Sequence, residues 1–217
     1  MRSMILWPSD FTATLTSNRS DPVLLFPTHQ DFTAMNSSNN TPRVVFEGKY
    51  QRMIVDGTWE YSERVHPGGL AAIILAVTPE ERIIFVEQFR IPIQQRTIEM
   101  PAGLVGDIDA GESIEQAAIR ELEEETGWTA DHAGILLIGP VSSGASSERI
   151  AFVRATGLRK VSSGGGDVDE DIVVHEIPRT QAAAWLVQKM HAGFAMDPKL
   201  WAALWLIDHA LDGTPIK

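Results

Sequence analysis

The most constraining feature of this sequence is a stripe of carboxylates on one face of an expected helix, residues 113–126. The helical period runs from Ser113 to Thr126, and Gly127 supplies a typical stop signal at the C-terminal end. At about 100° per residue, Glu121 and Glu125 lie nearly above one another, with Glu124 on the same side. A different face can pack against a sheet through three apolar residues: Ala118, Ile119 and Leu122.

Like charges on one stripe repel each other, which costs an isolated helix roughly 0.2–0.5 kcal/mol per pair. A bound cation would explain the stripe, because Mg²⁺ takes oxygen ligands and binds substrate phosphates at the same time. Arg120 is spaced to hold the carboxylate of Glu124 in place. A solvated acidic helix is an equally common alternative, and the stripe alone does not decide between the two.

The spacing of the neighbouring residues is much more specific. The segment fits the pattern G-x5-E-x7-R-E-U-x-E-E-x-G-U, where U is a bulky apolar residue, through Gly106, Glu112, Arg120, Glu121, Leu122, Glu124, Glu125, Gly127 and Trp128. A chance match has a probability on the order of one in a million. The segment therefore resembles the box of the Nudix hydrolases. Family members often use the glycine of a P-A-G turn as the first box residue, which here is Gly103, so we expect a short insertion in this loop.

The resemblance implies an α+β fold, a Nudix-type α/β/α sandwich with a mixed sheet. It also implies a divalent-metal site for Mg²⁺, with Mn²⁺ as an alternative. The matching positions make Glu121 and Glu125 metal ligands, Glu124 a third ligand, and the carbonyl of Ala102 a backbone ligand. Nudix enzymes typically hydrolyse a nucleoside diphosphate that is linked to another group.

The flanking segments resemble one branch of the family, the ADP-ribose and nucleotide-sugar pyrophosphatases. Four segments match its E-Q-x-R strand, its E-x-P-A-G turn, its S-P-G-x-S-x-E loop and its acidic loop: residues 86–90, 99–103, 142–148 and 169–172. Two positions depart from the branch. Ser143 stands where these enzymes usually have Pro, and Val168 stands where some have a catalytic Glu. The sequence therefore leaves the preferred sugar and the general base open.

The resemblance assigns the substrate-binding residues by position. Arg90 would contact the diphosphate, which fits an acidic protein that needs local positive charge. Glu99 and Gly144 would bind substrate from their matching motifs. Trp59 would stack on a nucleobase, as an aromatic residue does in some relatives, although hydrophobic packing is an equally good explanation of this residue.

Three acidic residues are the candidates for catalysis. Glu124 is one of them, and a loop carboxylate, Glu148 or Glu170, would orient or deprotonate the attacking water. Glu148 could instead bind a sugar hydroxyl, and the alternative without a function is an ion pair with Arg149 or contact with solvent; Glu170 could belong to a solvated acidic chain.

Composition excludes several other functions. The formal net charge of −11 argues against a general nucleic-acid binder and against attachment to an anionic membrane surface. The absence of Cys excludes disulfides, thiolate nucleophiles and Cys-ligated metals, and fits a reducing compartment. The longest apolar run, residues 70–77, is too short to span a membrane, so a cytoplasmic protein is expected.

Composition also divides the chain into three parts. Residues 1–43 form a polar N-terminal arm, expected to be poorly ordered or to dock on a partner subunit through residues 24–26. Residues 44–66 form strands that are expected to build a dimer, and Asp-Gly at position 56 predicts a hairpin. Residues 67–217 form the Nudix domain. Its expected strands are 70–77, 82–89, 96–100, 135–138, 149–154 and 172–177, and its last helices are 180–191 and one that begins with Asp197 as N-cap and Pro198 at its first position.

The expected activity is metal-dependent hydrolysis of the diphosphate of ADP-ribose or a related nucleoside diphosphate sugar, giving a nucleoside monophosphate and a sugar phosphate. Hydrolysis of GDP-mannose or another nucleotide sugar is one alternative. A non-catalytic Nudix domain that senses a nucleotide is an alternative of another class. A homodimer is expected, with Trp59 reaching into the partner's site, and Trp201 and Trp205 are expected to make core or dimer contacts.

Overall fold

The computed structural model describes residues 41–65, 69–109, 111–166 and 171–216. Most of the expected N-terminal arm therefore lies outside the described residues, and so do Val168 and Glu170. In the described part of the chain, no helix combines the length and the apolar character needed to cross a bilayer.

The first sheet is a three-stranded antiparallel meander of β1 (Arg43–Glu47), β2 (Gln51–Asp56) and β3 (Trp59–Arg64). The predicted hairpin is confirmed, because Asp56 pairs with Trp59 across a two-residue turn. Gly57 is the first central residue of that turn and has a φ of 61°, which a side chain would strain.

Two four-stranded sheets form the body of the molecule. The first has the order β7-β4-β10-β9, in which β4 (Leu70–Ala76) pairs parallel with β10 (Arg149–Thr156) and antiparallel with β7 (Ala102–Leu104). β9 (His132–Pro140) pairs antiparallel with β10, so the sheet is mixed, as expected.

The second sheet has the order β12-β5-β6-β13. β5 (Arg82–Arg90) lies between β12 (Val173–Pro178) and β6 (Gln95–Glu99), and it is antiparallel to both. The remaining short elements are β13 (Ala195–Met196), which is parallel to β6, the β8–β11 pair (Trp128–Thr129 and Arg159–Lys160), η1 (Ile91–Ile93) and η2 (Arg179–Gln181).

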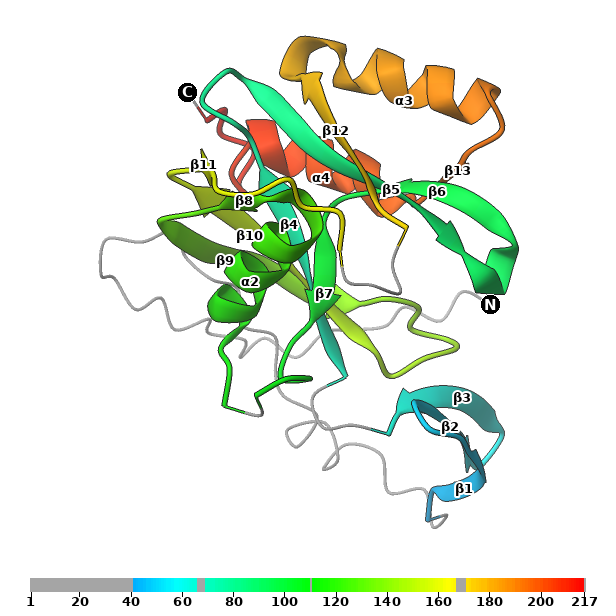
Figure 1. Cartoon of the computed structure of the whole chain (residues 1–217). Coiled ribbons are helices and arrows are strands. Elements are labelled where there is room, and N and C mark those ends of the chain that lie inside the picture. The colour runs from blue at the N-terminus through cyan, green and yellow to red at the C-terminus, as the bar shows by residue number, and fades with distance from the viewer. Residues whose placement is uncertain (1–40, 66–68, 110, 167–170, 217) are drawn as a thin grey trace, which may run out of the picture.

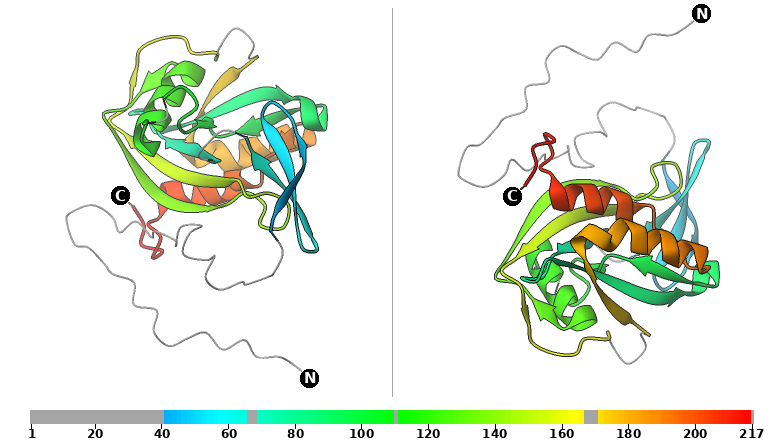
Figure 2. Two further views of the ribbon diagram at one scale, coloured as in Figure 1. Left: turned by 90° about the horizontal axis from the view of Figure 1, so that it is seen from below. Right: turned by 90° about the horizontal axis from the view of Figure 1, so that it is seen from above.

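Helices cover the sheets on both sides (Figures 1 and 2). α2 (Ile114–Thr126) lies on one side, and α3 (Ala182–His191) and α4 (Lys199–Asp208) lie on the other. Each side has its own apolar cluster, one around Leu122 of α2 and one around Leu200 of α4. This arrangement confirms the expected α+β sandwich.

The ends of α2 follow the local signals in its sequence. Ser113 is the N-cap and forms a capping box with Gln116, in which each side chain bonds the other residue's backbone N–H. Gly127 ends the helix at a φ of 74°, and a Cβ there would lie 2.2 Å from the carbonyl oxygen of Ser162. Both signals fix the position of the acidic face of α2.

Three expectations about other elements need correction. The residues of the P-A-G turn continue into a strand, because Ala102–Leu104 pairs with β4. The N-cap of α4 is Pro198, although the carboxylate of Asp197 accepts a hydrogen bond from the backbone N–H of Lys199 at 2.9 Å. Of the two roles expected for Trp201 and Trp205, the core contact is wrong, since 43% and 44% of their surfaces are exposed, and the dimer contact stays a prediction; the buried face of α4 consists of Leu200, Ala203, Leu206 and Ile207.

Candidate active site

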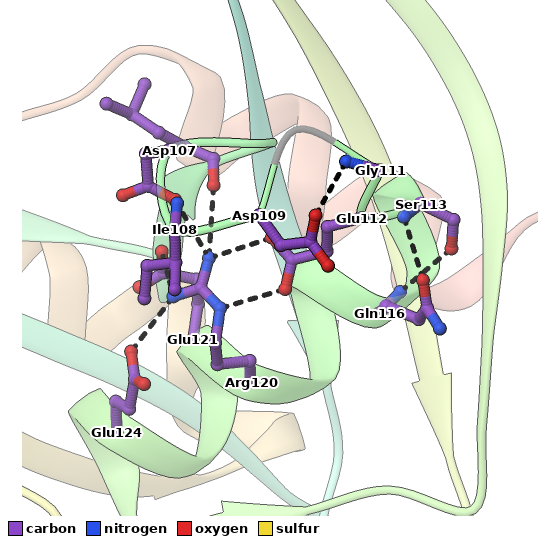
Figure 3. A network of polar contacts seen from close by, with 11 residues as sticks. Asp107, Ile108, Asp109, Gly111, Glu112, Ser113, Gln116, Arg120, Glu121 and Glu124 are labelled. Atoms are coloured by element: carbon purple, nitrogen blue, oxygen red, sulfur yellow. Dashed lines mark hydrogen bonds and ion pairs between the residues drawn. The ribbon is translucent and has the colours of Figure 1, made fainter.

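One guanidinium organises the acidic face of α2. Arg120 donates hydrogen bonds to Glu112 at 2.9 and 3.1 Å, to Glu121 at 2.9 Å, and to Glu124 at 3.0 Å. Figure 3 shows the side chain of Arg120 between these carboxylates, with Asp107 as a fourth acidic neighbour at 3.1 Å. The surrounding negative charge raises the pKa of Arg120 above its ordinary value. The expected contact of Arg120 with Glu124 is thus present, and Arg120 also binds the carboxylates of Asp107, Glu112 and Glu121.

Glu121 is held in a confined space between α2 and β7. Burial raises the pKa of Glu121 to about 7, although the charge of Arg120 opposes this effect and that of Glu124 adds to it. A Cβ on Gly103 would lie 1.8 Å from the Cδ of Glu121. Gly103 is therefore a glycine because the carboxylate of Glu121 occupies the space beside it. Gly106 has a different requirement, a positive φ of 78°.

Glu125 is buried, with 4% of its surface exposed, so the alternative of a solvated acidic helix does not hold for this residue. Its Oε2 accepts a hydrogen bond from the backbone N–H of Ala102 at 3.1 Å. This contact joins the acidic face of α2 to β7, where the predicted backbone ligand lies.

The residues fit a hard divalent cation in their chemistry. Three carboxylates and a nearby backbone carbonyl are the oxygen donors that Mg²⁺ and Mn²⁺ prefer. In the arrangement described here, no three acidic or histidine side chains of the described residues converge as a ready metal-binding group. Glu121 and Glu124 are turned toward Arg120, and Glu125 is turned toward Ala102.

A pocket of roughly 200 Å³ adjoins this face at Ala102. It brings together four residues that the sequence assigns to the site, namely Arg90, Glu99, Ala102 and Glu148. The remaining lining residues are Ala71, Ile73, Met100, Val141, Ile150, Asp197, Lys199 and Leu200.

Arg90 and Glu99 form a two-pronged ion pair in this pocket. The Nε of Arg90 lies 2.8 Å from one carboxylate oxygen of Glu99, and an Nη lies 2.6 Å from the other. Burial raises the pKa of Glu99, but hydrogen bonds from Arg90 and Thr97 outweigh it and lower the pKa below its ordinary value. An ionised Glu99 therefore fixes the guanidinium plane of Arg90 in the pocket wall.

Glu148 has a different partner from the ones considered from sequence. Its carboxylate accepts a hydrogen bond from the Nε of Arg64 at 2.5 Å, and not from Arg149. Arg64 ends β3, and the same strand bonds the loop before Glu148 through Ser62, whose backbone pairs with Ala145 and Ser147. The N-terminal sheet thus holds one wall of the pocket.

Two predicted substrate-binding residues lie apart from the other site residues. Trp59 is 61% exposed at the start of β3 and does not line the pocket. Gly144 is exposed in the loop 141–147, with open space around its Cα, and it does not line the pocket either. Their roles remain predictions, as does the role of Glu170, which lies outside the described residues.

Sequence reasoning missed two charged residues of the pocket, Asp197 and Lys199. Their side chains form an ion pair of 2.6 Å at the start of α4. The only local signal was the helix-capping pattern at Asp197, which carries no information about which pocket the helix borders.

Comparison with known proteins places these observations in a family. The NUDIX domain model matches residues 67–170. The chain is 33% identical over 153 residues to the methanol dehydrogenase activator of Bacillus methanolicus. This alignment covers 67% of this chain and 80% of that protein. It is 31% identical over 150 residues to the ADP-ribose pyrophosphatase of Escherichia coli (strain K12), which covers 64% of this chain and 70% of that protein.

A shorter alignment and a solved structure agree with this relationship. The ADP-ribose pyrophosphatase of Bacillus subtilis (strain 168) is 52% identical over 65 residues, or 30% of this chain and 32% of that protein. A crystal structure described as an ADP compounds hydrolase shares the fold, with a TM-score of 0.51 and 19% identity over 70% of this chain and 92% of that one. Because two relatives align over most of their length at more than 30% identity, this chain belongs to the Nudix family and is a Nudix hydrolase related to the ADP-ribose pyrophosphatases.

Proposed function

We propose that the protein hydrolyses the diphosphate bond of ADP-ribose or a related nucleoside diphosphate sugar, with Mg²⁺ or Mn²⁺ as cofactor. The products are a nucleoside monophosphate and a sugar phosphate. The observation that carries this proposal is the pocket in which Arg90, Glu99 and Glu148 meet beside Ala102 and the acidic face of α2. Such a pocket offers a cation to the diphosphate and carboxylates to the water. The relatives named as ADP-ribose pyrophosphatases support the substrate class.

Glu121, Glu124 and Glu125, together with the carbonyl of Ala102, are the residues proposed to hold the metal. When bound, a divalent ion supplies neutralisation of the phosphate charge and helps to activate water. Arg120 keeps the carboxylates of Glu121 and Glu124 on one side of α2 and offsets their mutual repulsion, while Glu125 accepts a hydrogen bond from the backbone N–H of Ala102.

The protein's own groups then have distinct tasks in the reaction. Arg90, fixed by Glu99, binds a phosphate oxygen and orients the diphosphate. Water attacks one phosphorus atom, the bond from that phosphorus to the bridging oxygen breaks, and the released phosphate leaves with the bridging oxygen. A carboxylate, Glu148 or Glu170, orients the water and accepts its proton. Glu124 on α2 is the third acidic residue proposed to take part in catalysis.

We also propose a homodimer formed through the N-terminal sheet. Its outer residues include an apolar group that is exposed in the single chain: Val44, Val45, Phe46, Tyr50, Met53 and Trp59. Exposed apolar groups of this extent commonly mark an interface. In such a dimer Trp59 reaches the partner's pocket and stacks on the nucleobase, which would explain why it does not line the pocket of its own chain.

The proposal is tested by incubating the purified protein with Mg²⁺ and ADP-ribose and measuring AMP and ribose 5-phosphate. Glu125→Gln should lower kcat at least about a hundredfold, because it removes a charged metal ligand. The matched control is Glu123→Gln, which changes an exposed carboxylate on the same helix and should leave kcat within about twofold.

The same assay separates the alternatives. Faster cleavage of GDP-mannose than of ADP-ribose would show that the preferred substrate is another nucleotide sugar. If a broad panel of nucleoside diphosphates stays intact with both Mg²⁺ and Mn²⁺, the hydrolysis proposal is wrong and a nucleotide-sensing role replaces it. A normal rate in Glu125→Gln would show that the wrong carboxylates are assigned to the metal.

A further inference from the structure

The start of α4 lines the pocket through Lys199 and Leu200, and Asp197 lines it from just before the helix. Both carboxylate oxygens of Asp197 contact Lys199. Oδ1 accepts a hydrogen bond from the backbone N–H of Lys199 at 2.9 Å, and Oδ2 lies 2.6 Å from the Nζ of Lys199. The backbone of Asp197 is itself attached to β6, through an N–H bond of 3.4 Å to the carbonyl of Ile98. Lys199 is therefore held at the pocket by a residue that the sheet holds in turn.

Lys199 and Arg90 are the two cations among the described residues that line the pocket. Both face Glu99: Arg90 binds its carboxylate directly, and the positive charge of Lys199 adds to the lowering of the pKa of Glu99. Only about a third of the side chain of Lys199 is exposed, so its ammonium meets less solvent than an ordinary surface lysine does. Arg90 is paired with Glu99 and Lys199 with Asp197, so an anion in the pocket would share each of these cations with a carboxylate.

The size and lining of the pocket indicate which part of a nucleoside diphosphate it takes. None of the described residues that line it has an aromatic ring, so it offers no surface on which a nucleobase stacks. A volume of roughly 200 Å³ and the carboxylates of Glu99, Glu148 and Asp197 suit a small, hydroxyl-rich group instead. Since Ala102 borders both the pocket and the acidic face of α2, a diphosphate can extend from one into the other.

We propose that Lys199 binds the phosphate of the sugar-phosphate half of the substrate, and that Asp197 is the positioning residue that aims its ammonium. This inference rests on the proposed function, because a sugar phosphate is one of the two products of that reaction. It assigns the pocket to the sugar phosphate and leaves the nucleotide half outside it.

Direct binding of the two products tests the inference without catalysis. By calorimetry, Lys199→Gln should raise the Kd for ribose 5-phosphate about tenfold and change the Kd for AMP less than twofold, because a charge-assisted hydrogen bond is lost at one end only. Lys199→Arg should recover most of the affinity. Asp197→Asn should raise the Kd for ribose 5-phosphate by a smaller factor, about threefold, with thermal unfolding confirming that each variant is folded.

Lys160→Gln is the matched control, because Lys160 also pairs with a carboxylate, Glu176, but does not line the pocket. It should leave both Kd values unchanged. An increase in the Kd for AMP in Lys199→Gln, an unchanged Kd for ribose 5-phosphate, or wild-type protein that binds no ribose 5-phosphate at millimolar concentration would each overturn the inference.

The two proposals fail in different ways. If the wild-type protein cleaves no nucleoside diphosphate but binds ribose 5-phosphate through Lys199, the hydrolysis proposal is wrong and the assignment of the pocket stands. If hydrolysis proceeds and Lys199→Gln leaves the KM for ADP-ribose unchanged, the assignment of the pocket is wrong and the hydrolysis proposal stands.

Discussion

Two residues beside the acidic face of α2 determine where Glu121 can lie. Gly103 leaves the space that the carboxylate fills, and Arg120 binds that carboxylate from the other side at 2.9 Å. Burial raises the pKa of Glu121 despite this contact, and the negative charges of Glu124 and Asp107 add to the rise. A cation among these residues would favour the ionised carboxylate.

Gly103→Ala should therefore lower kcat at least about tenfold while the protein stays folded. The new Cβ would lie 1.8 Å from the Cδ of Glu121, and the flexible carboxylate must move out of its place, whereas no backbone atom is among the three nearest neighbours. Steady-state kinetics with ADP-ribose and Mg²⁺, with a thermal melt of each protein, measure the two effects. The control is Gly134→Ala on β9, where a Cβ meets nothing within 4 Å, and equal rates in both variants would refute this prediction.

At the scale of elements, Glu87 joins four of them. From β5 its carboxylate contacts Arg96 of β6 at 2.8 Å, His175 of β12 at 3.0 Å and Lys189 of α3 at 2.9 Å. Burial would raise the pKa of Glu87, but these hydrogen bonds outweigh it and lower the pKa to about 2. The ionised carboxylate thus helps to hold α3 and β12 on the sheet.

The free energy of unfolding should consequently depend on pH through Glu87. Its pKa is lower in the folded protein, so its contribution, roughly 3 kcal/mol, is complete above pH 4.5 and is lost as the pH falls toward 2. Urea unfolding at pH 6 and pH 3 should show a smaller loss of stability in Glu87→Gln than in the wild type. Glu80→Gln changes an exposed carboxylate and should keep the wild-type dependence on pH; identical losses in all three proteins would contradict the prediction.

A second contact between elements joins β3 to the loop 141–147 and to Glu148, which follows the loop. Arg64 fixes Glu148 in the pocket, so Arg64→Gln should lower kcat/KM for ADP-ribose about tenfold by releasing that carboxylate. Arg52→Gln removes a similar arginine of the same sheet, which pairs with Glu63 and does not border the pocket, and serves as the control. Should both variants retain wild-type kcat/KM, Glu148 needs no support from β3.

The elements differ in how far the sequence predicts them. The ends of α2 and the turn at Gly57 were predicted because each depends on a few consecutive residues with a fixed backbone requirement. The pair of Arg64 and Glu148 was not predicted, because 84 residues separate its members and only the folded sheets bring them together. Lys199 was missed for the same reason, since its role depends on which strand ends α4 meets.

At the scale of the whole molecule, the N-terminal sheet leaves many apolar side chains in contact with water. Phe46 is 65% exposed and Val44 is 48% exposed on β1, which lies at the edge of the described sheet and pairs there with β2. We expect light scattering to give twice the 23.9 kDa mass of one chain. Val44→Asp with Phe46→Asp should shift the mass to one chain, because carboxylates would be buried at the interface.

Val161→Asp provides the comparison for that experiment. Val161 is 49% exposed but lies outside the N-terminal sheet, so this variant should remain a dimer. If Trp59 completes the partner's pocket, the monomeric variant should also lose affinity for the nucleotide. A wild-type protein with the mass of one chain would contradict the dimer.

The position of α4 has a practical consequence for finding ligands. Lys199 and Leu200 border the pocket, while Leu200, Ala203 and Leu206 of the same helix belong to the apolar core. A compound bound beside Lys199 would therefore stabilise the packing of α4, and unfolding of this helix would expose the apolar core to water. Binding to the native state raises the melting temperature, so a dye-based screen of compound libraries would register occupants of this pocket without any assay of turnover.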